Sequence, residues 1–301
     1  MQHTIHYHNC PVCSSARIRE VFSVKDHTVS GHLFAVWECA DCKLRFTQDI
    51  PDEGHIGAYY KSDEYISHTD KAPGLINRIY RIVRKRTMGS KRKLLAKYTG
   101  LANGRLLDIG AGTGAFVNEM KKNGWEVTGL EPDPDAREAA LSNYGVQLME
   151  ADSLYALPEA SFDAITLWHV LEHVHDLHGY LKKLKLLLKK DGILFIAVPN
   201  YTAVDSMVYQ QHWAAYDVPR HLYHFSPATI KTLSALHDLE LKARMPMWFD
   251  SFYISMLSSK YKSGRTRLPS ALFNGFRSNF SAMRNVEKCS SVIYILKEKR
   301  D

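Results

Sequence analysis

The fold is decided by the stretch Arg105-Leu-Leu-Asp-Ile-Gly-Ala-Gly-Thr-Gly-Ala-Phe-Val-Asn-Glu-Met120 and by the following Trp125-Glu-Val-Thr-Gly-Leu-Glu-Pro132. This pattern predicts a short buried strand, a tight glycine turn, a helix, and a second strand that ends on Glu131. Three glycines at alternate positions allow backbone conformations that a Cβ would forbid, and they let a ligand approach the main chain closely. Glu131 can accept hydrogen bonds from both hydroxyls of a ribose. The stretch therefore predicts a nucleoside-cofactor site.

Two cofactor classes fit the glycine turn. Gly110-x-Gly112-x-x-Ala115 satisfies the loose pattern of nicotinamide dinucleotide folds. Asp108, however, stands two residues before the first glycine, where those folds usually keep an apolar residue. The string Asp108-Ile-Gly-Ala-Gly-Thr-Gly114 resembles the first motif of class I S-adenosylmethionine (SAM)-dependent methyltransferases. The resemblance implies that the turn lies under the methionine part of SAM and that Glu131 holds its ribose.

Strand and helix patterns alternate from about residue 99 onward, so we expect one domain over residues 99–301, with substrate insertions at about 201–226 and 245–288. This order predicts an α/β protein with a doubly wound, Rossmann-like, mostly parallel sheet that binds its ligands at the carboxyl edge. The resemblance implies seven strands, of which the last is antiparallel. After the first two strands, we expect the others at residues 146–149, 162–168, 193–198, 240–244 and 290–297.

The first fifty residues read as a separate small domain. Two Cys-x-x-Cys turns separated by strand-like sequence match a tetrahedral zinc ribbon. So small a module has too little core to fold alone, and a structural zinc ion would supply the missing stability. We expect a zinc-ribbon-like domain over residues 1–50 whose metal ligands are Cys10, Cys13, Cys39 and Cys42. The fifth cysteine, Cys289, is expected to be a small core residue.

Residues 51–98 are expected to form a helical linker that acts as a lid over the cofactor. The pattern predicts a helix over 75–98 that Gly89-Ser90 breaks or bends. No acid lies between Asp70 and Asp108, so residues 71–105 are a candidate contact surface for a polyanion or an anionic membrane face. The plainer interpretation of such a charge run is a solvated helix face.

Trp168-His-Val-Leu-Glu-His-Val174 directly follows the expected fourth strand of the sheet. His169-x-x-Glu172-His173 also fits the inverted zinc-protease motif, but no third metal ligand is evident. The string resembles one found in ubiquinone-biosynthesis and sugar-modifying methyltransferases, where it lines the place at which the methyl group meets the acceptor. The resemblance thus assigns this string to the cofactor site.

A second polar string, Tyr216-Asp-Val-Pro-Arg-His-Leu-Tyr-His-Phe-Ser226, is expected on a loop. Methyl transfer to a hydroxyl or a carbon acid requires a base, and histidine suits that task. The string resembles one in zinc-domain methyltransferases that act on sugars. The alternative is that these residues only pack the loop. We expect His221 to be the base, with His224 as second choice and Tyr223 assisting, and we assign substrate binding to Tyr216, Arg220 and Tyr65.

Most of the remaining predictions concern the cofactor. An acid after the third strand can bond the adenine amino group, as the Asp-Ser-x positions do in the family that the chain resembles. The residues expected to bind SAM are Asp108, Gly110, Gly112, Gly114, Glu131, Asp152, Ser153, Leu154, Trp168, His169, His173 and Tyr60.

Three functions follow from these patterns. The first is a SAM-dependent methyltransferase that acts on oxygen or carbon of a small or glycan-type acceptor, for instance a sugar. The second is a zinc-ribbon rRNA or tRNA methyltransferase, which the basic stretch would serve. The third is a non-catalytic interaction module with a methyltransferase-like fold. Paired cysteines and the lack of an apolar signal segment in residues 1–10 lead us to expect a reducing, cytoplasmic location.

Overall fold

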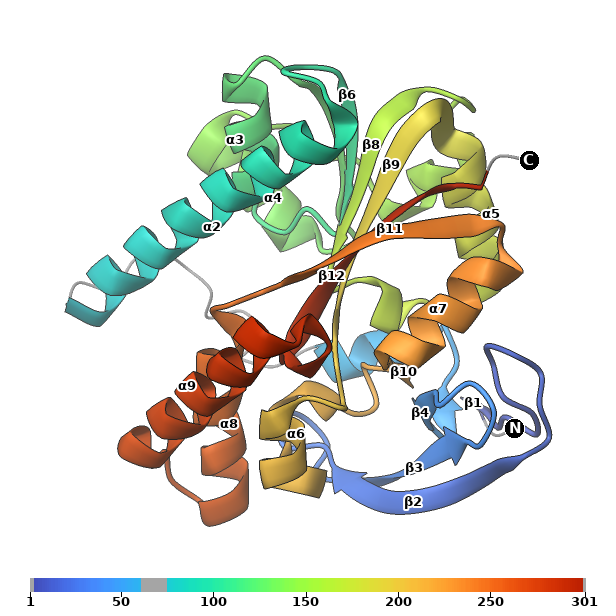
Figure 1. Ribbon diagram of the computed structural model, residues 1–301, viewed down its shortest axis with the longest axis vertical. Helices are drawn as coiled ribbons and strands as arrows, with labels where there is room; N and C mark the ends of the chain where they lie inside the picture. The colour runs from blue at the N-terminus through green and yellow to red at the C-terminus, as the bar shows by residue number, and fades with distance from the viewer. Residues whose placement is uncertain (1–2, 61–74, 300–301) are drawn as a thin grey trace.

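The structure is a computed structural model that describes residues 3–60 and 75–299, with side chains from residue 86 onward in the second range. Tyr65 and Lys71 lie outside the described residues. Figure 1 shows an upper α/β layer built on a central sheet and a lower part built from the N-terminal strands and C-terminal helices.

The central sheet has six strands in the order β11-β12-β9-β8-β6-β7. The four strands β9, β8, β6 and β7 pair in parallel, with a register shift between Phe162 and Ala164 of β8. Antiparallel β12 pairs with β9, and antiparallel β11 pairs with β12, as expected. The strands are β6 (Arg105–Ile109), β7 (Glu126–Leu130), β8 (Phe162–Trp168), β9 (Leu188–Pro199), β11 (Leu239–Pro246) and β12 (Ser291–Glu298).

The expected strand at residues 146–149 does not form a ladder. Only Met149 pairs with Leu130, as an isolated parallel bridge, before the chain turns into the 3-10 helix η2 (Ala151–Ala156). The seventh strand that the resemblance implied is thus reduced to one residue at the edge beside β7.

Helices cover both faces of the sheet, as a doubly wound fold requires. On one face, Leu95 of α2 and Phe116 of α3 pack on Leu106 and Phe195. On the other face, α5 and α7 cover Leu107 and its neighbours. The helices are α2 (Leu75–Thr99), α3 (Ala115–Lys122), α4 (Pro134–Tyr144), α5 (Leu177–Leu187) and α7 (Pro227–Leu236).

Helix α2 runs without interruption through Gly89-Ser90, so the expected break there is wrong. An internal glycine costs a helix only about 1 kcal/mol relative to alanine. Burial of Leu95 and partial burial of Met88 against the sheet offset that cost.

The N-terminal strands form a four-stranded sheet in the order β10-β4-β3-β2. Its fourth strand, β10 (Tyr223–His224), comes from the far end of the polar string and pairs antiparallel with β4. The N-terminal module therefore completes its sheet with a strand from the larger part of the chain. The module's own strands are β1 (Thr4–Ile5), β2 (Ile18–Lys25), β3 (Leu33–Cys39), β4 (Arg45–Thr47) and β5 (Ile50–Pro51).

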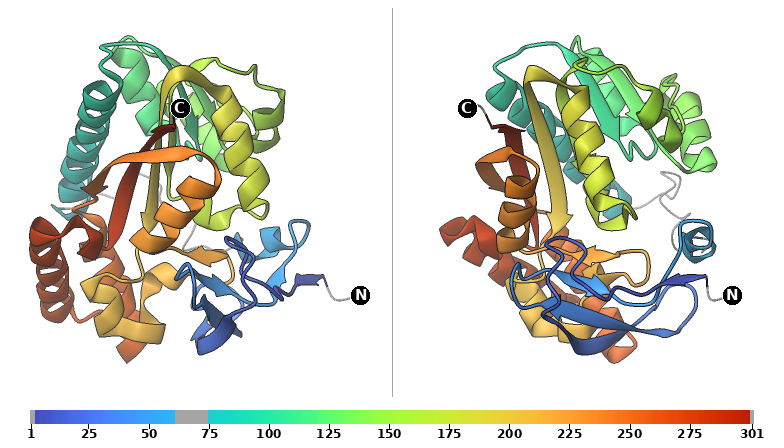
Figure 2. Two further views of the ribbon diagram at one scale, coloured as in Figure 1. Left: turned by 45° about the vertical axis from the view of Figure 1, so that its right-hand side comes forward. Right: turned by 90° about the vertical axis from the view of Figure 1, so that its right-hand side faces the viewer.

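The two segments expected as insertions are largely helical. Residues 201–226 contain α6 (Val204–Tyr209) and the 3-10 helices η4 (Gln210–His212) and η5 (Ala214–Tyr216) before β10. Residues 245–288 fold mainly into a helical hairpin, α8 (Asp250–Ser263) and α9 (Leu268–Arg284), which projects at one end of the molecule (Figure 2). Within the described part of the chain, no helix is both long and apolar enough to cross a bilayer.

Candidate functional site

The glycine turn after β6 has one open side. Gly110, Gly112 and Gly114 all have positive φ. A Cβ on Gly110 would lie 2.5 Å from Val170 Cγ2, and one on Gly114 would lie 2.8 Å from Ala140 Cβ. A Cβ on Gly112 would meet nothing within 4 Å. Packing therefore fixes the two outer glycines, whereas the backbone at Gly112 remains approachable by a ligand.

Glu131 stands beside this open side, at the end of β7. Its Oε2 accepts a hydrogen bond from the Gly112 amide at 2.7 Å, and its Oε1 accepts one from the Asp133 amide at 3.0 Å. Burial raises the pKa of Glu131, although both amides favour its charged form. A fixed carboxylate next to an approachable glycine backbone fits the ribose of SAM.

Asp108 is buried behind the turn. Its Oδ1 accepts a 2.6 Å hydrogen bond from the Thr166 hydroxyl, and burial raises its pKa to about 7. The Lys91 ammonium opposes this rise and lies 4.1 Å from the centre of the Trp168 ring. The sequence showed Lys91 only as one of many cations, and no local signal indicated that it lies near Asp108 and Trp168.

The expected adenine-side residues lie in η2. Asp152 is exposed, Ser153 is half-buried, and the Leu154 side chain is buried in the main core, so only its backbone is available to a ligand. Their role toward SAM stays a prediction.

His169 follows β8 and adopts a positive φ of 61°. Its Nε2 lies 2.9 Å from Asp250 Oδ2 and its Nδ1 lies 3.3 Å from Glu172 Oε1. Burial alone would lower the pKa of His169, but the two carboxylates outweigh it and raise the pKa to about 10. Both ring nitrogens are engaged, which argues against the metal role that the protease motif gives this histidine. Asp250 carried no sequence signal and was missed.

Glu172, His173 and His221 meet next to this segment. Their ligand atoms lie within 4.8 Å of one another, and the two imidazole rings meet edge to face with centroids 4.6 Å apart. Glu172 is fully buried, and no described group forms a hydrogen bond with its Oε2. Burial and the neighbouring His221 lower the pKa of His173 to about 4, so this ring is neutral near pH 7.

The backbone fixes the tautomers of both histidines. His221 Nδ1 lies 2.8 Å from the Ala215 carbonyl, and His173 Nδ1 lies 3.0 Å from the Arg220 carbonyl. A carbonyl can only accept, so each Nδ1 carries the hydrogen and each neutral ring keeps a lone pair on Nε2. The Tyr60 hydroxyl lies 2.9 Å from His173 Nδ1, which brings Tyr60, from the segment expected as a lid, to this cluster.

Three groups of described residues have the chemistry of a metal site, and one of them is the largely exposed set His3, Asp52 and His55. Two imidazoles and an unpartnered carboxylate oxygen at Glu172, His173 and His221 suit a divalent cation. The four N-terminal cysteines also cluster, with Sγ–Sγ distances of 3.5 Å for Cys10–Cys42 and 3.6 Å for Cys13–Cys39. Four Zn–S bonds of about 2.3 Å in a tetrahedron require sulfurs about 3.8 Å apart, so this cluster fits zinc.

The catalytic roles expected for Tyr223 and His224 do not fit the structure. Both side chains are buried in β10, between the N-terminal sheet and the larger part of the chain. The Tyr223 hydroxyl donates to the His175 carbonyl at 3.1 Å. Burial lowers the pKa of His224 well below its usual value, and its Nε2 lies 3.2 Å from the Thr47 hydroxyl. Tyr223 and His224 are 1% and 2% exposed, whereas His221, the first choice for the base, is 9% exposed and retains more access to an acceptor.

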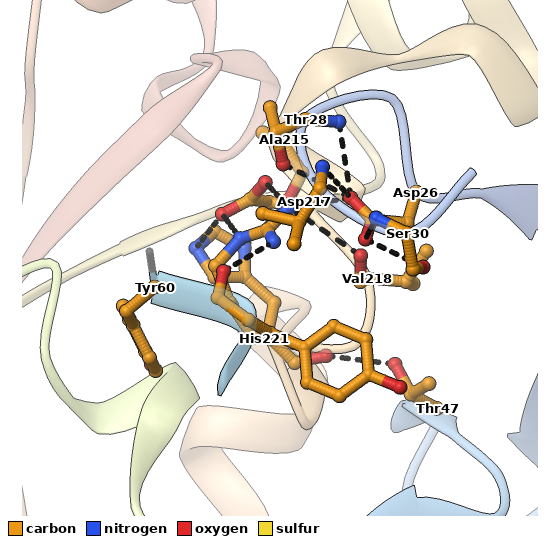
Figure 3. A network of polar contacts seen from close by, with 12 residues as sticks. Asp26, Thr28, Ser30, Thr47, Tyr60, Ala215, Asp217, Val218 and His221 are labelled. Carbon is orange, nitrogen blue, oxygen red and sulfur yellow. Dashed lines mark hydrogen bonds and ion pairs between the residues drawn. The ribbon is translucent and has the colours of Figure 1, made fainter. Parts of the chain in front are cut away.

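The substrate roles of Tyr216 and Arg220 do not fit either. The Tyr216 hydroxyl accepts from Arg45 Nη1 at 2.9 Å in a buried aromatic cluster. Arg220 is 1% exposed and its guanidinium donates to Asp217, Asp26 and the Tyr59 carbonyl. These bonds hold the loop to the N-terminal module, and Figure 3 shows Asp26 of that module beside Asp217 and Val218 of the loop.

The described part of the basic stretch is only partly available to a polyanion. Arg92 pairs with Glu119, Arg105 pairs with Glu126, and Lys91 faces Trp168. These three cations neutralise or pack against groups of the chain itself, which weakens the case for a phosphate-binding face there.

The class of this protein follows from the glycine turn, the acid after the second strand and the sheet order. A family model described as a methyltransferase domain matches residues 77–243. This match covers more than half of the chain, so the chain belongs to that methyltransferase-domain family.

Individual relatives share part of the chain. The ubiquinone biosynthesis O-methyltransferase of Pelagibacter ubique is 36% identical over 107 residues, which cover 34% of this chain and 45% of that protein. Its counterpart in Glaesserella parasuis is 38% identical over 118 residues, 36% of this chain and 50% of that protein. The chain spans about half the length of the curated relatives it matches.

A solved structure supports the fold. The Burkholderia thailandensis 1,6-didemethyltoxoflavin-N1-methyltransferase, with bound 1,6-didemethyltoxoflavin and S-adenosylhomocysteine, aligns with a TM-score of 0.51. The alignment covers 92% of this chain and all of that chain at 16% identity. At this identity the likeness concerns the fold alone.

Replacing Glu131 tests the ribose position. Each hydrogen bond to a charged group contributes about 1.5–3 kcal/mol, so we expect Glu131→Ala to weaken SAM binding at least about 100-fold in calorimetry. Glu126→Ala, at the exposed start of the same strand, is the control and should bind SAM like the wild type. Equal affinity of the Glu131 and Glu126 variants would exclude this ribose contact.

The His169–Asp250 pair predicts a pH dependence of stability. The folded pKa of about 10 lies above the unfolded value of about 6.5. The stabilisation is therefore complete below pH 6.5 and is lost as the pH rises toward 10. Burial lowers the pKa of Lys91 to about 8, below its unfolded value of about 10.4, so the contribution of Lys91 to stability rises with pH and opposes that of His169; Asp250 reduces the cost of burying the Lys91 charge.

We expect Asp250→Asn to lower the free energy of unfolding at pH 6, with a deficit that shrinks between pH 6.5 and 10 in urea titrations. Asp135→Asn, on the exposed first turn of α4, should give a deficit that is constant over this range. A constant deficit in Asp250→Asn would show that the pair is not charged in the folded protein.

Proposed function

We propose that this protein transfers a methyl group from SAM to the hydroxyl oxygen of a small-molecule acceptor, with His221 as the general base. The observation that carries the proposal is the place of the His221 ring: one of its nitrogens lies within 4.8 Å of the ligand atoms of Glu172 and His173, which follow the carboxyl end of β8. Val170, which packs on the glycine turn, joins this cluster to the expected cofactor position. The relatives named as O-methyltransferases support oxygen as the acceptor atom.

Bound SAM would supply a methyl carbon that the acceptor oxygen attacks in line as the carbon–sulfur bond breaks. Gly112 and Glu131 orient the cofactor. His221 Nε2 takes the hydroxyl proton, and the Ala215 carbonyl holds the Nδ1 hydrogen of the resulting imidazolium. The buried Glu172 carboxylate stabilises that positive charge. The same base would serve a carbon acid.

A zinc ion in the four-cysteine cluster is part of this proposal, in a structural role. Its four thiolates leave no open position for a substrate. It supports the base indirectly, because the Thr47 hydroxyl of β4 donates to the His221 carbonyl at 2.7 Å.

A sugar is one acceptor that we propose to test. The aromatic residues that could stack on a sugar, Trp213, Tyr216 and Tyr223, are all buried, so a sugar would have to bind through other contacts. A phenolic acceptor needs only a deprotonated oxygen in front of the methyl group. We therefore rank phenols and catechols before sugars.

The experiment is transfer of labelled methyl from SAM to three acceptor panels: phenols and catechols, nucleotide sugars, and ribosomal or transfer RNA. We expect alkali-stable label in the hydroxyl compounds and no salt-sensitive labelling of RNA. Label confined to RNA would overturn the proposal. Label found only on a sugar carbon would show that the acceptor atom is carbon and not oxygen, while His221 could still be the base.

A further inference from the structure

The helical hairpin α8–α9 has its large apolar side chains on the outside. The residues of α9 that face the protein are Ala271, Asn274, Gly275, Ser278 and Ala282. Those that face away include Phe273, Phe276 and Met283, which are 67%, 64% and 72% exposed. A helix on a water-facing surface normally shows the reverse arrangement, with large apolar groups inward.

The exposed apolar residues form one stripe. Leu268, Leu272, Phe276 and Phe280 recur every four residues, and Phe273 and Met283 fall on the same side of the helix. Figures 1 and 2 both place α9 on the outside of α8, and these side chains stay exposed in the described part of the chain.

Small residues allow the two helices to approach closely. A Cβ on Gly275 would lie 2.6 Å from Phe252 Cδ1 of α8. The buried face of α8 contains four serines and one isoleucine. Small residues between helices, with large apolar residues outward, are typical of helix pairs that face lipid.

The charged side chains of the hairpin beyond Asp250 are all positive. Residues 251–284 contain no Asp or Glu. They carry six cations, all exposed: Lys260, Lys262, Arg265, Arg267, Arg277 and Arg284. Aromatic and aliphatic groups flanked by Lys and Arg match the boundary between anionic headgroups and acyl chains.

We propose that the α8–α9 hairpin docks the protein on the surface of an anionic lipid bilayer, with the α9 stripe inserted among the headgroups. A second copy of the chain is a less suitable partner for the α9 stripe, because a twofold-symmetric dimer would bring the six cations of one hairpin close to the six of the other. Docking would also bring the site to the bilayer. Asp250, the first residue of α8, contacts His169 at the carboxyl edge of the sheet.

The test is co-sedimentation of the full chain with vesicles of phosphatidylcholine alone and of phosphatidylcholine mixed with phosphatidylglycerol. We expect binding to the anionic vesicles that weakens as salt is raised. The variant Phe273→Ser/Phe280→Ser/Met283→Ser should reduce the partition coefficient at least about tenfold. Arg265→Gln/Arg277→Gln should reduce it about 25-fold, since each cation near the surface contributes about fivefold.

Matched controls use equally exposed residues elsewhere. Leu33→Ser/Leu141→Ser/Leu236→Ser and Lys121→Gln/Lys122→Gln should bind vesicles like the wild type. Sedimentation of the lipid-free protein distinguishes the alternative. The proposal would be overturned if the wild type did not bind vesicles, or if the Phe273→Ser/Phe280→Ser/Met283→Ser variant bound them equally well. It would also be overturned if the wild type formed a dimer in the absence of lipid and this variant, but none of the others, were monomeric.

Discussion

His221→Asn is expected to lower kcat by about 10²- to 10⁴-fold, the usual contribution of a general base. The asparagine amide can replace the Nδ1 hydrogen that bonds to the Ala215 carbonyl, but it offers no basic nitrogen at the Nε2 position. The variant therefore separates the packing role of the residue from its chemical role. The affinity for SAM, measured by calorimetry, should stay within a few-fold of the wild type.

Two further variants complete this experiment. His212→Ala removes a histidine from η4 and should leave kcat unchanged. His221→Ala should lose as much activity as His221→Asn but melt at a lower temperature, because the bond to Ala215 is lost as well. A kcat for His221→Asn within tenfold of the wild type would show that another group takes the proton.

The second large effect concerns zinc. Structural zinc contributes on the order of 10 kcal/mol in isolated zinc modules. We expect Cys39→Ser to lower the free energy of unfolding by at least about 3 kcal/mol, a large fraction of the total stability of a typical domain. Metal analysis should find one zinc per wild-type chain and less in the variant.

The loss of zinc should also disturb the position of His221 in the active site. Strand β4 of the zinc module pairs with β10, and Thr47 at its end holds the His221 carbonyl. A chelator that removes the metal should thus reduce activity together with stability. Cys289→Ser changes a buried cysteine outside the cluster and should keep the full zinc content. Equal zinc content in the Cys39 and Cys289 variants would exclude the four-cysteine site.

The central elements could be predicted because their signals are local. β6, the glycine turn and β7 follow from the pattern of adjacent residues, although the distant Val170 and Ala140 complete the packing around the turn. The strand pattern of β11 and β12 was sufficient to place both. The pattern at 146–149 gave a strand that the structure reduces to Met149, because pairing depends on a neighbour that sequence periodicity does not specify.

The polar string 216–226 could not be interpreted from its composition. Its tyrosines, histidines and arginine look equally suited to substrate, yet β10 buries Tyr223 and His224 against β4, with Tyr223 opposite Phe46 and His224 opposite Arg45. The Arg220 guanidinium donates its hydrogen bonds to Asp26 and Asp217 of the protein itself. Of the residues in this string, only His221 has a ring nitrogen close to Glu172 and His173. Asp250 contacts His169 at the site from a segment that carries no recognisable motif.

The sequence alone determined the methyltransferase-type sheet, the glycine turn with Glu131, and the cysteine pairs, because these depend on residues close together in the chain. The tertiary structure decided which histidine meets Glu172 and His173, and it placed the large apolar residues of α9 outward. Both depend on which distant segments pack together and on which groups that packing leaves uncovered. Residue identities and spacing along the chain do not specify either one.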